Sequence, residues 1–170
     1  YFRNLEAGVS GAAPITNFDA SNFKVRFACE VKDYDWSRYI VFTGGPLMGE
    51  FAQFALVAAA EAVADAALGD DVNRRRCGVV WSSGVGGIET YFQECMDYAK
   101  GGELPRFSPF FVPRMIADLA AGHIAMKYGF MGPNYSVTSA CASSNHAMID
   151  AFNLIRLGKA DVIVTGGAEA

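Results

Sequence analysis

The sequence predicts an α/β fold, and two observations support that prediction. The first is composition: 52% of the 170 residues are hydrophobic, 19% are charged, and alanine and glycine are abundant, as in a globular interior of helices and strands. The second is the order strand, tight turn, helix, strand, which residues 135–167 follow. A chain of this length can form one domain with a sizeable core.

The stretch 135–167 gives the clearest order of elements. A short β-leaning run leads through a turn that holds Cys141 into a helix. The apolar residues of this helix recur at spacings of three and four, which places them on one helical face. They are Ala147, Met148, Ala151, Phe152 and Ile155. The helix ends at Gly158, because glycine adopts the left-handed conformation after a helix without a Cβ penalty, and residues 161–167 then form a second buried strand.

Upstream, the pattern predicts loop, helix and strand in turn. Residues 1–36 mix turn formers with aromatic residues and are expected to be mostly loop, with a short extended piece at 23–31. Residues 51–68 are rich in alanine and contain no proline or glycine, which is typical of a largely buried helix. A strand is expected at 77–82, after a charged connector.

Two further helices are predicted at 88–99 and 114–128, each followed by glycine. Between them lies a segment with three prolines and three phenylalanines, which cannot be a regular helix or a central strand. Exposed aromatic loops of this kind often belong to interfaces. The alternative is a loop that folds back onto the core of its own chain.

Cys141 is the candidate nucleophile. A thiol at a helix N-terminus faces unpaired backbone N–H groups and the positive end of the helix dipole, which favour the thiolate. The same N–H groups can stabilise an oxyanion on a carbonyl that the sulfur attacks. The neighbouring residues are small and leave room for a substrate: Ser139, Ala140, Ala142, Ser143 and Ser144. The alternative is a buried free cysteine that only packs.

Composition argues against several other functions. The net charge of −4 does not suit a general nucleic-acid surface. No apolar run is long and pure enough for a membrane span, and no signal peptide is visible. The four cysteines show no metal-ligand spacing, so we expect no metal site. Because no secretory signal is visible, we expect a cytoplasmic protein with reduced thiols. The glycine-rich residues 82–87 lack the spacing of phosphate-binding and dinucleotide-binding loops.

Six stretches form an ordered set of motifs. The central one is Val-Thr-Ser-Ala-Cys-Ala-Ser-Ser at residues 137–144; the others are 83–89, 107–113, 121–124, 132–134 and 158–169. This set resembles the β-ketoacyl-acyl-carrier-protein synthases, in particular the elongating type II condensing enzymes (synthase II) of bacterial fatty acid synthesis. The resemblance covers nearly the whole chain.

The resemblance implies a fold and its boundaries. Residues 1–170 are expected to be a partial N-terminal ketosynthase domain of thiolase-like architecture, with a mostly parallel sheet flanked by helices. Both ends are expected to be truncated, because a complete family member is more than twice this long and residues 4–11 resemble the end of its first helix.

The resemblance also implies an activity. Cys141 takes an acyl group from the phosphopantetheine of acyl carrier protein, and malonyl-carrier protein then condenses with that thioester with loss of carbon dioxide. No cofactor is expected apart from this carrier-bound group. The family completes its site with two histidines, a lysine and a glycine-rich loop from the C-terminal half. The 170-residue chain alone is therefore expected to be nearly inactive, and neither His123 nor His146 is predicted as the base.

Two substrate-binding residues follow from the same resemblance. Val85, between glycines, corresponds to the side chain that gates the acyl pocket in the family, where isoleucine is frequent. Phe111 corresponds to a residue that reaches across a homodimer interface toward the partner's acyl pocket. The resemblance thus predicts a homodimer with acyl carrier protein as its partner.

Residues 41–48 depart from the family pattern. Where similar enzymes begin a basic helix that attracts the carrier protein, this chain has Thr-Gly-Gly-Pro at 43–46, which forbids a good helix start. The loss of the basic residues leaves carrier docking by this segment in doubt. These four residues can be encoded by ACG-GGA-GGC-CCG, and this string, followed by C, reads Arg-Glu-Ala-Arg when shifted by one base, which is the missing motif. We hypothesise a local frameshift, restored near Met48, in which case the segment says nothing about docking.

Three alternatives stay open. One is a ketosynthase of polyketide or aryl-polyene synthesis, although the context of Cys141 is closer to the fatty-acid type. Another is a non-catalytic partner subunit resembling chain-length factors, which typically lack the nucleophile. The third is a thiolase that uses coenzyme A, which the segment 107–113 disfavours.

Overall fold

The computed structural model describes residues 2–32, 34–39, 48–102, 104 and 106–170. The chain divides into two compact units, Tyr1–Asp35 and Trp36–Ala170. The frameshift hypothesis concerns residues 41–47, which lie outside the described residues, so it stays a prediction.

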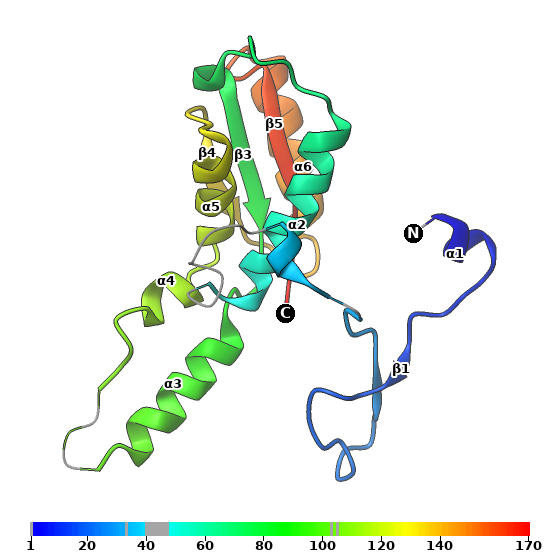
Figure 1. Ribbon diagram of the computed structural model, residues 1–170, viewed down its shortest axis with the longest axis vertical. Coiled ribbons are helices and arrows are strands. Elements are labelled where there is room, and N and C mark those ends of the chain that lie inside the picture. Colours follow the sequence, from blue (N-terminus) through cyan, green and yellow to red (C-terminus); the bar gives the residue numbers. More distant parts are fainter. Residues whose placement is uncertain (1, 33, 40–47, 103, 105) are drawn as a thin grey trace. The chain divides into compact units, whose positions relative to one another are not determined.

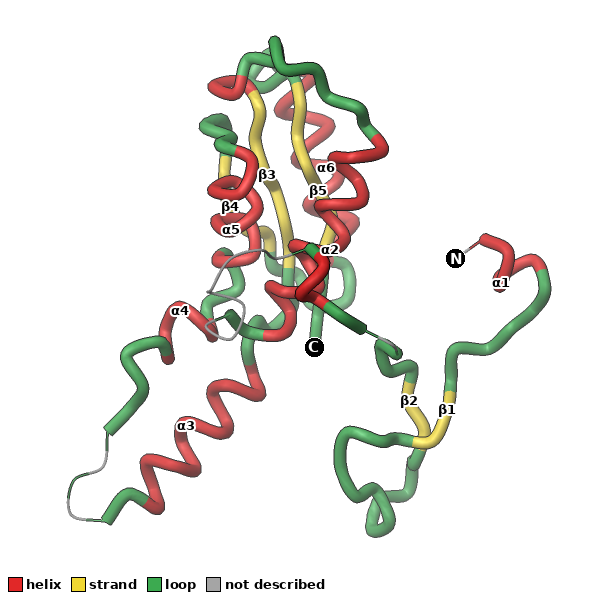
Figure 2. The backbone as a smooth tube through the Cα atoms, viewed as in Figure 1, coloured by secondary structure: helices red, strands yellow, loops and turns green. Residues whose placement is uncertain are grey.

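The first unit is mostly loop, as the sequence predicts (Figure 2). It contains a short helix, α1 (Phe2–Glu6), and two strands, β1 (Ala13–Pro14) and β2 (Phe27–Ala28). The strands pair antiparallel, and β2 lies within the extended piece expected at 23–31.

The second unit is built on a three-stranded parallel sheet (Figure 1). Its strands are β3 (Cys77–Ser82), β4 (Asn134–Val137) and β5 (Val162–Gly167), in the spatial order β4-β3-β5. Val79 lies opposite Asn134 on one side and Val164 on the other. The predicted strand at 77–82 and the predicted parallel arrangement are both confirmed.

Helices cover both faces of this sheet, and β3 is buried along its whole length. Helices α2 (Glu50–Asp65) and α5 (Leu119–Tyr128) pack against each other and against one face, while α6 (Ser143–Arg156) packs against all three strands (Figure 1). Successive side chains of β3 point alternately to the two faces of the sheet. Cys77, Val79 and Trp81 join the core with α2 and α5, whereas Ser82 lies beside the first turn of α6.

The remaining described elements are one long helix, α3 (Ile88–Lys100), and three short ones. The short ones are the 3₁₀ turns η1 (Trp36–Arg38) and η3 (Arg74–Arg76) and the one-turn helix α4 (Phe111–Met115). The helix predicted at 88–99 is therefore confirmed, and the helix predicted at 51–68 is confirmed as α2, although it ends three residues early. The C-cap of α2 is Ala66, and the next residue, Ala67, has a left-handed φ of 45°, which cannot continue the helix.

The helix predicted at 114–128 is wrong in its first turn. Residues 116–118 separate α4 from α5, because Ile116 is extended, with ψ 128°. The carbonyl of Met115 accepts a 2.9 Å hydrogen bond from the N–H of Gly87 and is withdrawn from the helix.

The expectation that the proline-rich segment 107–113 is irregular is wrong for its last three residues, which belong to α4. Pro113 lies in the first turn of α4, where its missing N–H costs no helical hydrogen bond.

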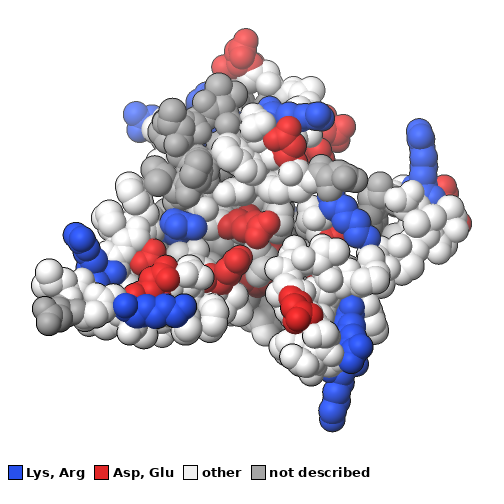
Figure 3. Space-filling model, turned by 60° about the horizontal axis from the view of Figure 1, so that its bottom comes forward, with Lys and Arg blue, Asp and Glu red and all other residues white. Residues whose placement is uncertain are grey.

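Among the described residues, no helix is both long and apolar enough to cross a membrane. On the face drawn in Figure 3, acidic and basic side chains are both scattered among uncharged ones.

Candidate active site

Cys141 lies in the turn between β4 and α6, where the sequence predicts it. Strand β4 ends at Val137 and α6 begins at Ser143, with Ala142 as its N-cap. The thiol is exposed, so the alternative of a buried packing cysteine is wrong for the described chain. Cys141 precedes the N-cap by one residue and is thus just outside the helix.

The turn has a strained backbone that its own hydrogen bonds hold. Ala140 has φ 51°, a left-handed conformation that side chains with a Cβ rarely adopt. The buried hydroxyl of Ser143 donates to the carbonyl of Ala140 at 2.6 Å and accepts from the N–H of Ser139 at 2.8 Å. The N–H groups of Ala142 and Ser143 donate within the turn, to Ser139 and Ala140. These contacts fix the direction of Cys141.

Cys141 and Val85 line one open hollow of about 500 Å³. Parallel strands place their carboxyl ends at one edge of the sheet, and the loops after β3, β4 and β5 all contribute to this hollow. Its lining consists of Ser82, Ser83, Gly84, Val85, Ala140, Cys141, Ser143, Ser144, Gly167, Ala168 and Glu169. The structure therefore brings two of the three predicted site residues together.

Phe111 does not line this hollow. Its ring stacks on Phe107, with centroids 5.0 Å apart, and lies 6.1 Å from the ring of Tyr91 on α3. Phe107 stacks in turn on Tyr98 at 4.7 Å. These contacts lie within one chain and leave Phe107 and Phe110 exposed. The expectation that Phe111 reaches a partner's pocket stays a prediction.

Neither histidine lines the hollow. The Nδ1 atom of His146 lies 2.6 Å from the hydroxyl oxygen of Ser139. His123 belongs to α5, and burial lowers the pKa of its imidazole. The sequence indicates Ser143 only as a small neighbour of Cys141, and it does not indicate the hydrogen bonds of Ser143 or of Glu169. Their hydrogen bonds depend on the geometry of the turn and of the strand ends, for which the sequence has no spacing signal.

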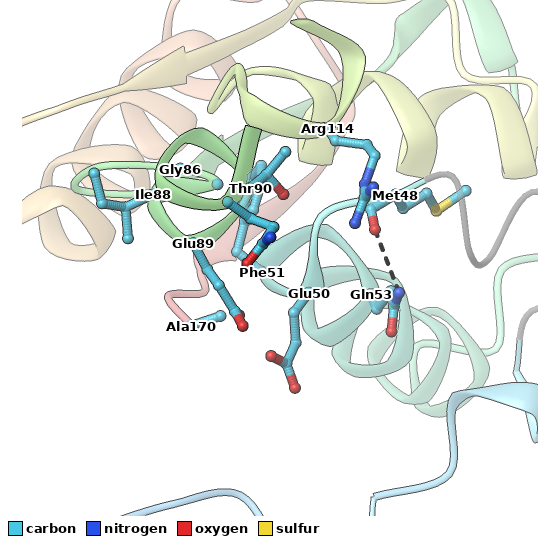
Figure 4. A pocket seen from close by; sticks show the side chains of 12 residues that line it. Met48, Glu50, Phe51, Gln53, Gly86, Ile88, Glu89, Thr90, Arg114 and Ala170 are labelled. Atoms are coloured by element: carbon cyan, nitrogen blue, oxygen red, sulfur yellow. Dashed lines mark hydrogen bonds between the residues drawn. The ribbon is translucent and has the colours of Figure 1, made fainter. Parts of the chain in front are cut away.

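A second hollow, of about 320 Å³, lies between the starts of α2 and α3 (Figure 4). Glu50, Glu89 and Arg114 face it, and Gln53 donates a hydrogen bond to the carbonyl of Met48 there. None of the predicted site residues lines it, so the Cys141 hollow is the better candidate. Over the described ranges, no group of three or more His, Cys, Asp or Glu side chains could hold a metal ion.

The fold and the site define an α/β protein with an exposed cysteine at a strand-to-helix turn, an arrangement suited to nucleophilic catalysis. The family model described as "Beta-ketoacyl synthase, N-terminal domain" matches residues 1–170. The chain belongs to this family, and its fold is thiolase-like.

Two named relatives support this assignment. The chain is 39% identical over 175 residues to 3-oxoacyl-[acyl-carrier-protein] synthase 2 of Staphylococcus aureus, covering 99% of this chain and 42% of the relative. It is 34% identical over 174 residues to 3-oxoacyl-[acyl-carrier-protein] synthase I, chloroplastic, of Arabidopsis thaliana, covering 100% and 37%. The chain thus spans about two fifths of the length of these relatives.

Two solved structures are similar in fold. The ishigamide ketosynthase/chain length factor superposes with a TM-score of 0.89 at 32% identity, covering 99% of this chain and 42% of that one. A beta-ketoacyl synthase from Burkholderia phymatum superposes with a TM-score of 0.82 at 23% identity, covering 99% and 42%. The second likeness concerns the fold alone.

Proposed function

We propose that this chain is the N-terminal part of a β-ketoacyl-acyl-carrier-protein synthase that elongates fatty acyl chains. The observation that carries the proposal is the exposed thiol of Cys141, which lies at a hydrogen-bonded turn and lines a hollow together with Val85. The names of the Staphylococcus aureus and Arabidopsis relatives support the same reaction.

The first proposed step is transfer of the acyl group. The Cys141 thiol gives up its proton and the sulfur attacks the carbonyl carbon of an acyl thioester on carrier-protein phosphopantetheine. A new C–S bond to Cys141 forms, the C–S bond to pantetheine breaks, and the pantetheine sulfur leaves as a thiol with that proton. The N–H groups of Ala142 and Ser143 already donate within the turn. The N–H of Cys141 is therefore the turn donor that we assign to the oxyanion.

The second proposed step is the condensation. Malonyl-carrier protein loses carbon dioxide, and the electron pair of the broken C–C bond attacks the carbonyl carbon of acyl-Cys141. A new C–C bond forms and the thiolate leaves, so the product is a β-ketoacyl chain on the carrier protein. In this scheme Val85 is a wall of the acyl site.

The partners and location are part of the proposal. Acyl carrier protein delivers both substrates, no cofactor is required beyond its phosphopantetheine, and Phe111 is assigned to a homodimer interface with the exposed aromatic residues around it. We place the reaction in the cytoplasm; the chloroplastic Arabidopsis relative makes a plastid the alternative compartment.

The experiment that tests the proposal is acylation of the full-length protein that contains this chain. The protein is incubated with an acyl-carrier protein, digested, and mapped by mass spectrometry, before and after addition of malonyl-carrier protein. We expect the acyl mass on the Cys141 peptide, its loss with malonyl substrate, and no acylation in Cys141→Ala. Cys29→Ala is the control, because Cys29 is also exposed. Acylation that persists in Cys141→Ala, or none in the wild type, contradicts the proposal.

A second candidate function is chain extension in polyketide synthesis. The ishigamide ketosynthase/chain length factor favours it, because its TM-score and identity to this chain are both high. Product analysis in the same assay separates the two: fatty acid synthesis gives one condensation per cycle of β-carbon reduction, whereas a polyketide enzyme extends unreduced β-ketoacyl chains repeatedly.

A further inference from the structure

The carboxylate of Glu169 binds the loop that carries Val85. Its Oε2 atom accepts hydrogen bonds from the N–H of Gly84 at 2.6 Å and from the N–H of Val85 at 3.3 Å. Its Oε1 atom accepts from the hydroxyl of Ser83 at 2.9 Å. One side chain from the end of β5 therefore bonds three successive residues after β3.

The sheet brings these two segments together. Strands β3 and β5 are parallel neighbours, with Ser82 opposite Gly167, so both chains leave the sheet at the same edge. The N–H of Ala168 continues the pairing with a 3.0 Å bond to the carbonyl of Ser82. Glu169 is the next residue, and it thus lies beside the loop at a position that the register fixes.

The carboxylate of Glu169 lies close to the loop after β3, and the N–H groups of that loop are suitable donors for an anion. A Cβ on Gly84 would lie 2.8 Å from Oε2 of Glu169, so only glycine fits there without a shift. Successive backbone N–H groups that point at one atom form an anion site, and charged acceptors make the shorter and stronger hydrogen bonds. Here the anion is the carboxylate of Glu169.

Two further hydrogen bonds connect the loop that Glu169 binds to other parts of the Cys141 hollow. The hydroxyl of Ser83, which donates to Glu169, also accepts from the N–H of Gly86 at 2.9 Å. The hydroxyl of Thr138 donates to the carbonyl of Ser83 at 3.2 Å, which joins the loop to the segment before Cys141. The residues on both sides of Val85 are therefore held, while its side chain is exposed in the hollow.

We propose that Glu169 is a positioning residue that fixes Val85 relative to Cys141 and thereby sets the acyl chain length that the site accepts. The inference rests on the proposed function, because it treats Val85 as a wall of an acyl site. A carboxylate is required because a glutamine offers one acceptor oxygen and an NH₂ group that would face the loop N–H groups.

The first test measures amide exchange, and its first part needs only the wild-type protein. Amide hydrogen exchange of the wild-type protein is expected to show protected N–H groups at Gly84 and Val85, and Glu169→Gln is expected to raise their exchange rates about 10-fold, the effect of losing one charge-assisted hydrogen bond. Unprotected amides at Gly84 and Val85 in the folded wild type would overturn the inference even if Glu169→Gln did not fold.

The second test measures specificity in the full-length protein. The ratio of kcat/KM for a long and a short acyl-carrier protein is compared in the wild type, in Glu169→Gln, and in the control Glu89→Gln, whose exposed carboxylate faces the other hollow. We expect Glu169→Gln to change the ratio about 5- to 10-fold, within the range of coupled neighbours, and the control to leave it unchanged.

A double-variant comparison separates positioning from a general loss of structure. In a Val85→Ala background, where the gating side chain is shortened, Glu169→Gln is expected to change the ratio by less than about 2-fold. An equal effect in both backgrounds, or an unchanged ratio in Glu169→Gln, contradicts the inference. A wild type that is never acylated on Cys141 contradicts the proposed function instead, and amide exchange still tests the Glu169 contact.

Discussion

The hydroxyl of Ser143 donates a 2.6 Å hydrogen bond to the carbonyl oxygen of Ala140, the residue directly before the candidate nucleophile. Ala140 has φ 51°, a conformation that costs about 1–2 kcal/mol for a residue with a Cβ. The same hydroxyl accepts from the N–H of Ser139. The turn that presents Cys141 is therefore stabilised by a side chain from the first residue of α6.

We predict that Ser143→Ala lowers the free energy of unfolding by about 1–3 kcal/mol, because two part-buried hydrogen bonds of the turn are lost, each worth about 0.5–1.5 kcal/mol. Urea unfolding of the chain measures the change. Ser21→Ala is the control, since Ser21 is an exposed loop residue, and it should stay within about 0.5 kcal/mol of the wild type. An unchanged stability in Ser143→Ala would show that the turn holds its conformation without this hydroxyl.

The sequence predicted the elements whose signals are local. The buried strand at 77–82 follows from its apolar run, and the helix after Cys141 follows from apolar residues at spacings of three and four and from Gly158 beyond its end, so both were placed correctly. The break at Ile116 was missed because its cause is a hydrogen bond from Gly87, far away in the sequence. Glu169 was missed for the same reason: its bonds exist only once β3 and β5 are paired.

Two glycines should respond oppositely to alanine. A Cβ on Gly78 would lie 2.5 Å from the carbonyl oxygen of Pro133, which accepts a hydrogen bond from Val79 and cannot move away freely. Gly122 lies inside α5, and a Cβ there would meet no described atom within 4 Å.

We therefore predict that Gly78→Ala destabilises the fold by about 3 kcal/mol through overpacking. We predict that Gly122→Ala stabilises it by about 0.5–1 kcal/mol, because alanine favours the helix and restricts the unfolded chain. Thermal unfolding of the two variants provides the comparison. A Gly78→Ala variant as stable as the wild type would mean that β3 shifts easily against the segment before β4.

Val85→Phe should narrow the hollow beside Cys141. Val85 is exposed there, so a larger ring extends into open space and the fold should tolerate it. Under the proposed function, we expect kcat/KM for long acyl chains to fall about 10-fold or more, with a much smaller effect on short chains. Steady-state kinetics of the full-length protein with acyl-carrier proteins of two lengths give the result, with Val31→Phe as a control at an exposed site in the first unit. An unchanged preference would remove Val85 from the acyl site.

The cysteines should differ in reactivity according to their burial. Cys141 and Cys29 are exposed, whereas Cys77 is fully buried in β3, and burial raises the pKa of the Cys77 thiol. Since the thiolate is the reactive form, iodoacetamide near neutral pH should label Cys141 and Cys29 at least about 100-fold faster than Cys77, which reacts only when the strand opens. Peptide mass mapping over time measures the rates, and labelling in urea, where all cysteines are accessible, is the control. Fast labelling of Cys77 without denaturant would mean that β3, on which both the Val85 loop and the Glu169 contact depend, opens readily in the native protein.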